Sequence, residues 1–212
     1  LFGRLPIGWL QLSHNKGRLI AAVSGVAFAN LLVFMQLGIL GALNGSTVAP
    51  YTMLNADIII SSQDGNTLTD SANIARVRMF QALGVSGVAA AVPLYVGMLP
   101  FSMADGTSVS LLAFGMETSQ PSFASAGIAA SLARLETENT ALLDIQTRGV
   151  PATAFAGLAA GQPFPFEVNG QTMTAIGTLA VGGGFLADGT IVLSNQTFLR
   201  FFGKRTSGAP SH

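Results

Sequence analysis

Residues 19–43 read LIAAVSGVAFANLLVFMQLGILGAL, and this stretch decides the fold of the chain. No Asp, Glu, Lys or Arg occurs between Arg18 and Asp57. The hydrocarbon core of a bilayer is about 30 Å thick, and a helix crosses it with about 20 residues. We therefore predict that residues 19–43 form one transmembrane helix, which is long enough to cross with some tilt.

Basic residues near the two ends of this helix set its orientation. Arg4, Lys16 and Arg18 precede it, whereas the first basic residue after it is Arg76. Short cytoplasmic segments carry an excess of Lys and Arg. We therefore expect residues 1–18 in the cytoplasm and the residues after about 44 on the outer side, which for a bacterial inner (plasma) membrane is the periplasm.

Two other interpretations of the stretch remain open. A secretory signal peptide has an apolar core of about 7–15 residues and a cleavage site with small residues. This stretch is longer, and no clear cleavage site follows it. A buried helix of a soluble protein is the other interpretation, but such a helix rarely stays uncharged for so long. A retained membrane anchor is favoured over both.

Small and amide side chains in the stretch predict contacts with other membrane helices. Ala21, Gly25 and Ala29 recur at four-residue spacing, which lets helix backbones approach closely in lipid. Asn30 and Gln36 lie inside the span, where an unpaired amide is costly. Both amides either bond within their own helix or face partner helices. The second interpretation makes the helix a member of a bundle.

The cytoplasmic segment, residues 1–18, contains Trp9, the single tryptophan of the chain. Tryptophan is enriched where membrane headgroups meet water. We therefore predict that Trp9 is an interfacial anchor on a short helix lying in the membrane surface. A coupling surface for a cytoplasmic partner is the functional alternative for this segment.

The composition of the whole chain agrees with a membrane protein. Only 9% of the 212 residues are charged and 50% are hydrophobic, whereas a soluble domain has about 25% charged residues. The net charge is zero, but residues 1–18 sum to +3 and residues 44–212 to −3. Because no basic patch alternates with aromatic residues, we expect no nucleic-acid partner. The lipid bilayer is the expected partner of the apolar stretch.

Residues 44–203 are predicted to form an α+β periplasmic domain, and residues 204–212 a disordered tail. Strands and helices mix there without regular alternation, which favours this class. Asn169-Gly170 suits a type I′ hairpin turn, Asp105-Gly106 marks a second turn, and Asn195 is expected to cap the last helix. Strands are predicted at residues 57–62, 88–103, 109–116, 140–145, 164–168, 171–181 and 190–193, and helices at residues 71–83, 124–135 and 195–202.

Residues 79–104 also lack charge, so a second membrane span is the alternative for this part of the chain. Pro93, Pro100 and several glycines count against a continuous helix there. The predicted hairpin turn that follows directly also favours strands.

Signatures of catalysis and ligand binding are almost absent. His14 is predicted to be cytoplasmic and His212 is the last residue, so neither suits a catalytic triad outside the membrane. The chain has no cysteine, which excludes disulfides, thiolate metal sites and cysteine nucleophiles. No P-loop motif occurs, and Gly182-Gly183-Gly184 leads toward a predicted strand rather than a helix. We expect no enzymatic activity, catalytic residue, cofactor or metal in this chain.

Eight short motifs occur in order along residues 7–202: WLQL at 9–12, FMQLG at 34–38, NAD at 55–57, QALG at 81–84, VPLY at 92–95, EVNG at 167–170, ADG at 187–189 and FLR at 198–200. In their order and spacing they resemble DevC-like permeases. These are subunits of ABC exporters and are related to the MacB and FtsX permeases.

The resemblance implies a permease with four transmembrane helices and a MacB-like periplasmic core between the first and second. It also implies a separate cytoplasmic ABC ATPase, a second permease copy and a periplasmic membrane-fusion adaptor as partners. The implied function is export of a lipid-like or other hydrophobic substrate. Helices two to four are missing from this chain, so we expect the N-terminal part of such a permease, as a fragment or a natural truncation.

Two alternatives to a permease remain. A single-span anchored adaptor or binding module would act in the periplasm without transport. An anchored hydrolase would have to rely on carboxylates, because the chain offers no suitable histidine or cysteine outside the membrane.

Overall fold

The computed structural model describes residue 8 and residues 14–69, 73–102, 106, 108–182, 184, 187–203 and 208–212. The chain divides into two compact units, Leu1–Asn44 and Gly45–His212. We call the second the outer unit. Each unit is described by itself below.

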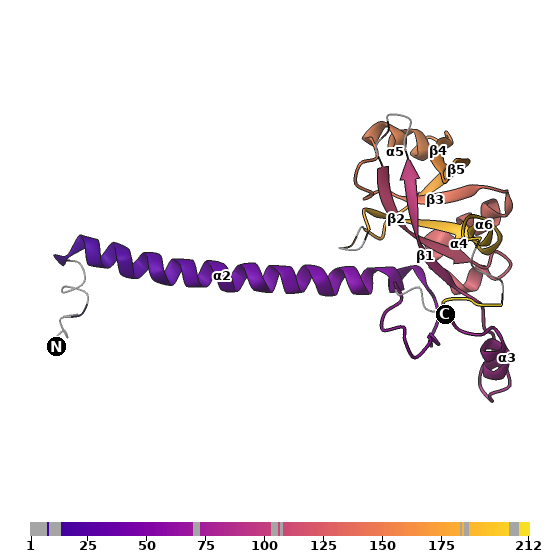
Figure 1. The fold of residues 1–212 in the computed structure, drawn as a ribbon, viewed down its shortest axis with the longest axis horizontal. Coiled ribbons are helices and arrows are strands. Elements are labelled where there is room, and N and C mark those ends of the chain that lie inside the picture. Colours follow the sequence, from indigo (N-terminus) through magenta and orange to yellow (C-terminus); the bar gives the residue numbers. More distant parts are fainter. Residues whose placement is uncertain are drawn as a thin grey trace, which may run out of the picture. The chain divides into compact units, whose positions relative to one another are not determined.

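The apolar stretch forms one continuous helix, α2 (Lys16–Val48), as Figure 1 shows. It covers all of the predicted span, residues 19–43. At about 1.5 Å per residue, its 33 residues extend over about 50 Å. None of its side chains is buried. In the described part of the chain, this is the one helix long and apolar enough to cross a membrane.

Six strands of the outer unit close into a barrel in the order β1-β2-β6-β3-β5-β4. The pairs β2–β6 and β3–β5 are parallel, and the other pairs are antiparallel. Closure between β1 and β4 rests on the pairing of Ser102 with Glu167. The α+β mixture is confirmed, but closure of the sheet was not predicted. The strands are β1 (Tyr95–Ser102), β2 (Ser108–Met116), β3 (Thr140–Asp144), β4 (Phe164–Val168), β5 (Gln171–Leu179) and β6 (Gly189–Ser194).

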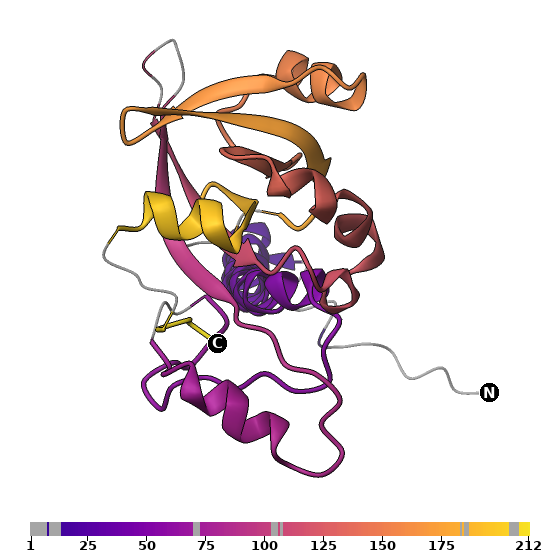
Figure 2. The same ribbon diagram turned by 90° about the vertical axis from the view of Figure 1, so that its right-hand side faces the viewer.

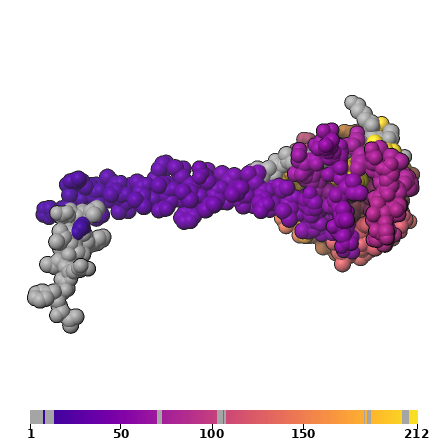
Figure 3. All heavy atoms as spheres, turned by 90° about the horizontal axis from the view of Figure 1, so that it is seen from below, coloured from indigo at the N-terminus to yellow at the C-terminus, as the bar shows by residue number. Residues whose placement is uncertain are grey.

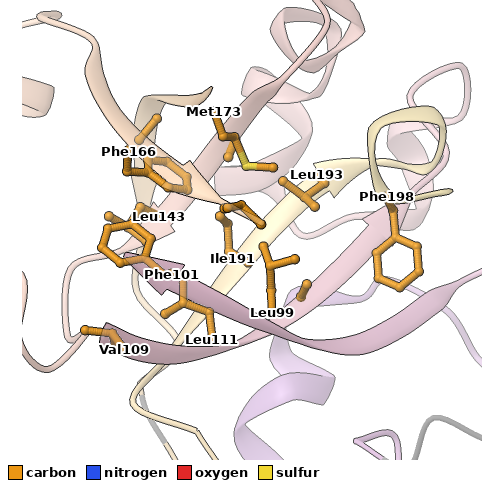
Figure 4. Close-up of a cluster of buried hydrophobic side chains, with 14 of the residues drawn as sticks. Leu99, Phe101, Val109, Leu111, Leu143, Phe166, Met173, Ile191, Leu193 and Phe198 are labelled. Carbon is orange, nitrogen blue, oxygen red and sulfur yellow. The ribbon is translucent and has the colours of Figure 1, made fainter. Parts of the chain in front are cut away.

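Strands β2, β3 and β6 are buried on both faces. In β2, Leu111 and Ala113 belong to one hydrophobic cluster, whereas Leu112 and Phe114 belong to another. This follows from strand geometry, because successive side chains point to opposite faces of a sheet. Figure 4 shows the first cluster, which contains side chains of all six strands together with Phe198. The second cluster packs these strands against α4 (Ala126–Leu132).

Two predicted hairpins are confirmed. Strands β4 and β5 pair across Asn169 and Gly170, whose φ angles are 49° and 73°. Positive φ at both positions is what a type I′ turn requires. Strands β1 and β2 form the other hairpin. Gly106 lies in its turn with a φ of 84°, and Asp105 lies outside the described residues.

The remaining helices are short. They are α3 (Val77–Leu83), α5 (Ala152–Ala159) and α6 (Asn195–Phe201), with 3-10 turns η1 (Ala49–Met53), η2 (Pro121–Phe123) and η3 (Ala133–Glu136). Helix α5 was not predicted. The cap of α6 is Ser194 rather than the predicted Asn195, because the Ser194 side chain accepts a hydrogen bond of 3.2 Å from the Thr197 N–H.

For residues 57–104 one prediction is wrong and one alternative is excluded. Residues 57–62 form no strand, and the segment has no neighbouring strand to pair with among the described residues. A second membrane span is excluded because residues 95–102 form β1 of the barrel. The predicted strand at residues 88–103 begins only at Tyr95. Of the predicted helix at 71–83, residues 71–72 lie outside the described residues, and the described part is helical from Val77.

Residues 208–212, which we call the tail segment, were predicted to be disordered but are folded onto the outer unit. Ser211 is fully buried, and its hydroxyl accepts a hydrogen bond of 3.0 Å from the Val96 N–H. The Ile74 N–H donates to the Pro210 carbonyl at 2.8 Å. The prediction is therefore wrong for the tail segment, and residues 204–207 lie outside the described residues.

Tyr95 is a buried titratable group at the start of β1, with 1% of its surface exposed. Burial raises the pKa of its phenol above the usual 10.0, an effect that Arg76 opposes and Glu117 reinforces. The folded state therefore holds the phenolic proton more tightly than the unfolded state. The stability that this contributes is complete below pH 10 and is lost as the pH rises through the folded-state pKa.

We expect the alkaline titration of a Tyr51→Phe variant to report Tyr95 alone, since the chain has two tyrosines. Tyrosinate absorbance should rise above pH 10.0, together with loss of the folded circular dichroism signal, because a charged phenolate is costly in this environment. A Tyr95→Phe variant should lack this late transition. Titration of Tyr95 at or below pH 10.0 would contradict the assigned burial effect.

Candidate functional site

The small residues predicted to pack against other helices lie along one side of α2. At about 100° per residue, Ala21, Gly25, Ala29 and Gln36 fall within roughly 80° of one another around the helix. A Cβ added at Gly25 would meet no atom within 4 Å. This side of α2 is therefore open to a close neighbour, and we call it the first face.

Asn30 lies elsewhere on α2, although it was predicted together with the other packing residues. It is roughly 130° around the helix from the first face and close to the direction of Gly41. A Cβ at Gly41 also meets no atom within 4 Å. Asn30 and Gly41 define a second face, so α2 presents polar or small groups in two directions.

Neither the Asn30 nor the Gln36 side chain forms a hydrogen bond with another residue that the structure describes. Bonding within the helix, one of the two interpretations of these amides, is therefore not observed. In a bilayer each amide would need a partner, because no water is available in the hydrocarbon core. Trp9, the predicted interfacial anchor, lies outside the described residues.

An apolar groove of about 510 Å³ lies within the outer unit, and the sequence did not predict it. Figure 2 shows that the chain around α3 runs mostly as loops on one side of the barrel. The groove is lined mainly by parts of four segments, residues 54–60, 74–82, 87–94 and 116–124, with Pro210 and His212 of the tail segment.

The surface beside the groove is unusually apolar for exposed residues. Ile58 is 77% exposed and Ile60 46%, and on α3 Phe80 is 59% exposed and Val77 53%. The space-filling view in Figure 3 shows residues of this purple part of the sequence at the surface. Contiguous exposed apolar patches mark interaction sites more often than scattered apolar residues do.

The charged groups around the groove are few. Its lining includes four charged residues, Asp57, Arg76, Arg78 and Glu117. Arg78 donates a hydrogen bond of 2.9 Å to Gln81, and Glu117 accepts one of 2.7 Å from Asn195. In the described part of the chain, no three His, Asp or Glu residues lie close enough to hold a metal ion. The site is therefore suited to apolar contact and main-chain pairing.

Solved structures resemble part of this chain, whereas the two sequence comparisons found nothing. No known family model matches the chain, and no curated protein matches its sequence. A solved structure, the extracellular domain of the noncanonic ABC-type transporter YknZ from Gram-positive bacteria, superposes with a TM-score of 0.42 and 12% identity. The alignment covers 72% of this chain and 76% of that chain.

Proposed function

We propose that the chain is the N-terminal part of a permease subunit of an ABC-type exporter. In this proposal α2 is one helix of a transmembrane bundle, with its N-terminus in the cytoplasm. The outer unit is a MacB-like core in the periplasm, and the membrane is the bacterial inner membrane. The motifs along residues 7–202 support this assignment through their resemblance to DevC-like permeases.

The observation that carries the proposal is the pattern on α2. The helix is uncharged from Leu19 to its end at Val48, none of its residues is buried, and it has two faces with small or amide side chains. A simple lipid anchor needs no such faces, because lipid tails pack against any apolar side chain. Two faces suit a helix with neighbours on two sides, as in a permease bundle.

The proposal leaves covalent chemistry to another subunit. A separate ABC ATPase would hydrolyse ATP in the cytoplasm, and a second permease copy would complete the membrane part. The outer unit would engage a membrane-fusion adaptor. The proposed cargo is lipid-like or otherwise hydrophobic, and the chain itself contributes no catalytic residue, cofactor or metal ligand.

A photo-crosslinking amino acid placed in α2 tests this proposal. Positions Gln36 and Asn30, one on each face, are expected to yield protein adducts in membranes of the native host. Leu31, which at about 100° per residue lies on neither face, is the matched control and should yield mainly lipid adducts. Mass spectrometry should identify the adducts as helices of a transporter permease or a second copy of this chain.

Two results would overturn the permease assignment. Lipid adducts at all three positions would show that α2 has no helical neighbours, and would favour a single-span binding module built around the apolar groove. Measurable ATP turnover by the purified chain would show that the motor activity is not supplied by a separate subunit.

A further inference from the structure

Two segments that line the apolar groove belong to no strand of the sheet. We call residues 56–61 the first wall and residues 89–92 the second wall; both include residues that line the groove. Neither wall makes a main-chain hydrogen bond to another described residue. Such rows of free N–H and C=O groups are what an exposed sheet edge presents to another strand.

The three isoleucines at the centre of the first wall alternate as side chains of a strand do. Ile58 and Ile60 are exposed, whereas Ile59 between them packs against the second hydrophobic cluster. This alternation has the period of two that is typical of a half-buried strand. Three consecutive β-branched residues also favour that conformation. The local sequence thus prefers a strand, and what is missing is a partner.

The same part of the outer unit already holds the tail segment through main-chain hydrogen bonds. The N–H of Arg76 donates to the Gly208 carbonyl at 3.0 Å on one side of the tail segment. On the other side the Leu94 N–H donates to the His212 carbonyl at 3.0 Å, and the Ser211 N–H donates to the Leu94 carbonyl at 2.8 Å. Because Pro210 and His212 also line the groove, this interface continues directly into it.

The groove also offers space for apolar side chains. Ala89, Ala90 and Ala91 line it beside the exposed isoleucines, so bulky apolar side chains can enter between the two walls.

We propose that the apolar groove is a strand-addition site, which binds an extended apolar polypeptide segment of a partner protein through the main chain of its walls. A lipid acyl chain would cover the same apolar side chains but leave the walls' N–H and C=O groups buried without partners, which is costly. A peptide strand covers the apolar side chains and also pairs with the N–H and C=O groups of the walls, as in other cases of strand addition. This inference concerns a binding site and does not depend on the transport role.

Peptide binding to the whole chain in lipid nanodiscs tests the proposal. The probe is a fluorescent peptide of alternating valine and threonine, about seven residues long, enough to span either wall at about 3.3 Å per residue. A matched peptide carries N-methyl groups on alternate amides and cannot pair along one edge. We expect the plain peptide to bind and to slow amide hydrogen exchange at residues 56–61 and 89–92. The N-methylated peptide should bind about tenfold more weakly or worse.

Two variants of the chain test whether the peptide binds in the groove or at any exposed apolar residue. Ile58→Asp should weaken peptide binding about tenfold or more, because it places a charge in the groove, and its high exposure means that folding is unaffected. Ile145→Asp is the matched control, since Ile145 is 47% exposed but does not line the groove. It should bind the peptide as the unaltered chain does.

Four outcomes would overturn the proposal. The first is absence of peptide binding, and the second is equal binding of the N-methylated peptide. The third is slower hydrogen exchange of the walls with oleate in place of peptide. The fourth is hydrogen exchange that slows as the protein concentration rises without any probe, which would assign the groove to a second copy of the chain.

Discussion

The outer unit produced alone, Gly45–His212, is expected in the soluble fraction, whereas the whole chain is expected to sediment with membranes. The outer unit has its own two hydrophobic clusters, both formed by residues after Gly45. Helix α2 instead exposes large apolar side chains along its length, with Phe34 71% exposed and Leu40 63%. At about 25 cal/mol for each Å² of apolar surface, such a helix strongly favours lipid over water.

Extraction with high salt and alkaline carbonate measures this difference. Proteins held at the membrane surface by charge are released, and spanning helices stay. The matched control is the whole chain with Val33→Arg and Phe34→Arg, since each arginine at the centre of a span costs about 2.5–3.5 kcal/mol. Release of the unaltered chain by carbonate would show that α2 does not span the membrane.

Phe198→Ala is expected to destabilise the outer unit by about 3–5 kcal/mol, a large part of the usual stability of a domain. Phe198 is fully buried, and its ring stacks on Phe202 with centroids 4.1 Å apart. Its Cβ also lies where a side chain at Gly115 would be, so α6 sits directly on β2. Truncation would leave a cavity between α6 and the barrel, because the Phe198 ring fills this space.

Chemical denaturation followed by circular dichroism measures this effect. Phe80→Ala is the matched control, because Phe80 is 59% exposed on α3. Its stability should stay within about 0.5 kcal/mol of the unaltered chain. A loss below about 1 kcal/mol for Phe198→Ala would show that α6 does not contribute to the core in the way described.

Features that depend on local sequence were predicted well. Helix α2 follows from a long uncharged stretch, and the turn at Asn169-Gly170 follows from residues that tolerate positive φ. The strands of the barrel carry β-branched and apolar residues that mark them individually. Each of these signals lies within one short segment, so it does not depend on contacts with distant parts of the chain.

Features that depend on distant pairing were not predicted. Closure of the barrel requires β2 to lie parallel to β6 and β3 to β5, and no single segment records these neighbours. The segment at residues 57–62 shows the reverse case, because its isoleucines favour a strand but no described strand lies beside it. The tail segment looked disordered since it is short and polar, yet main-chain pairing and the buried Ser211 hold it.

Of the two kinds of candidate surface, the first face of α2 was predictable from local sequence and the apolar groove was not. The first face of α2 could be predicted from spacing alone, and only the helical geometry separates Asn30 from it. The apolar groove has no sequence motif, because its walls are ordinary apolar segments that come together only in the folded outer unit. The unpaired strand preference of residues 57–62 was the one signal in the sequence that pointed toward it.

The pairing of β2 with β6 also bears on how the protein acquires its structure in time. Leu111 pairs with Gly189, so the barrel cannot close until most of the chain has been synthesised. Until then the β1–β2 hairpin exposes apolar side chains on both faces. Folds with such long-range contacts form in milliseconds to seconds rather than microseconds. During this interval the hairpin is the segment most exposed to aggregation, and a chaperone that shields it would raise the yield of folded protein.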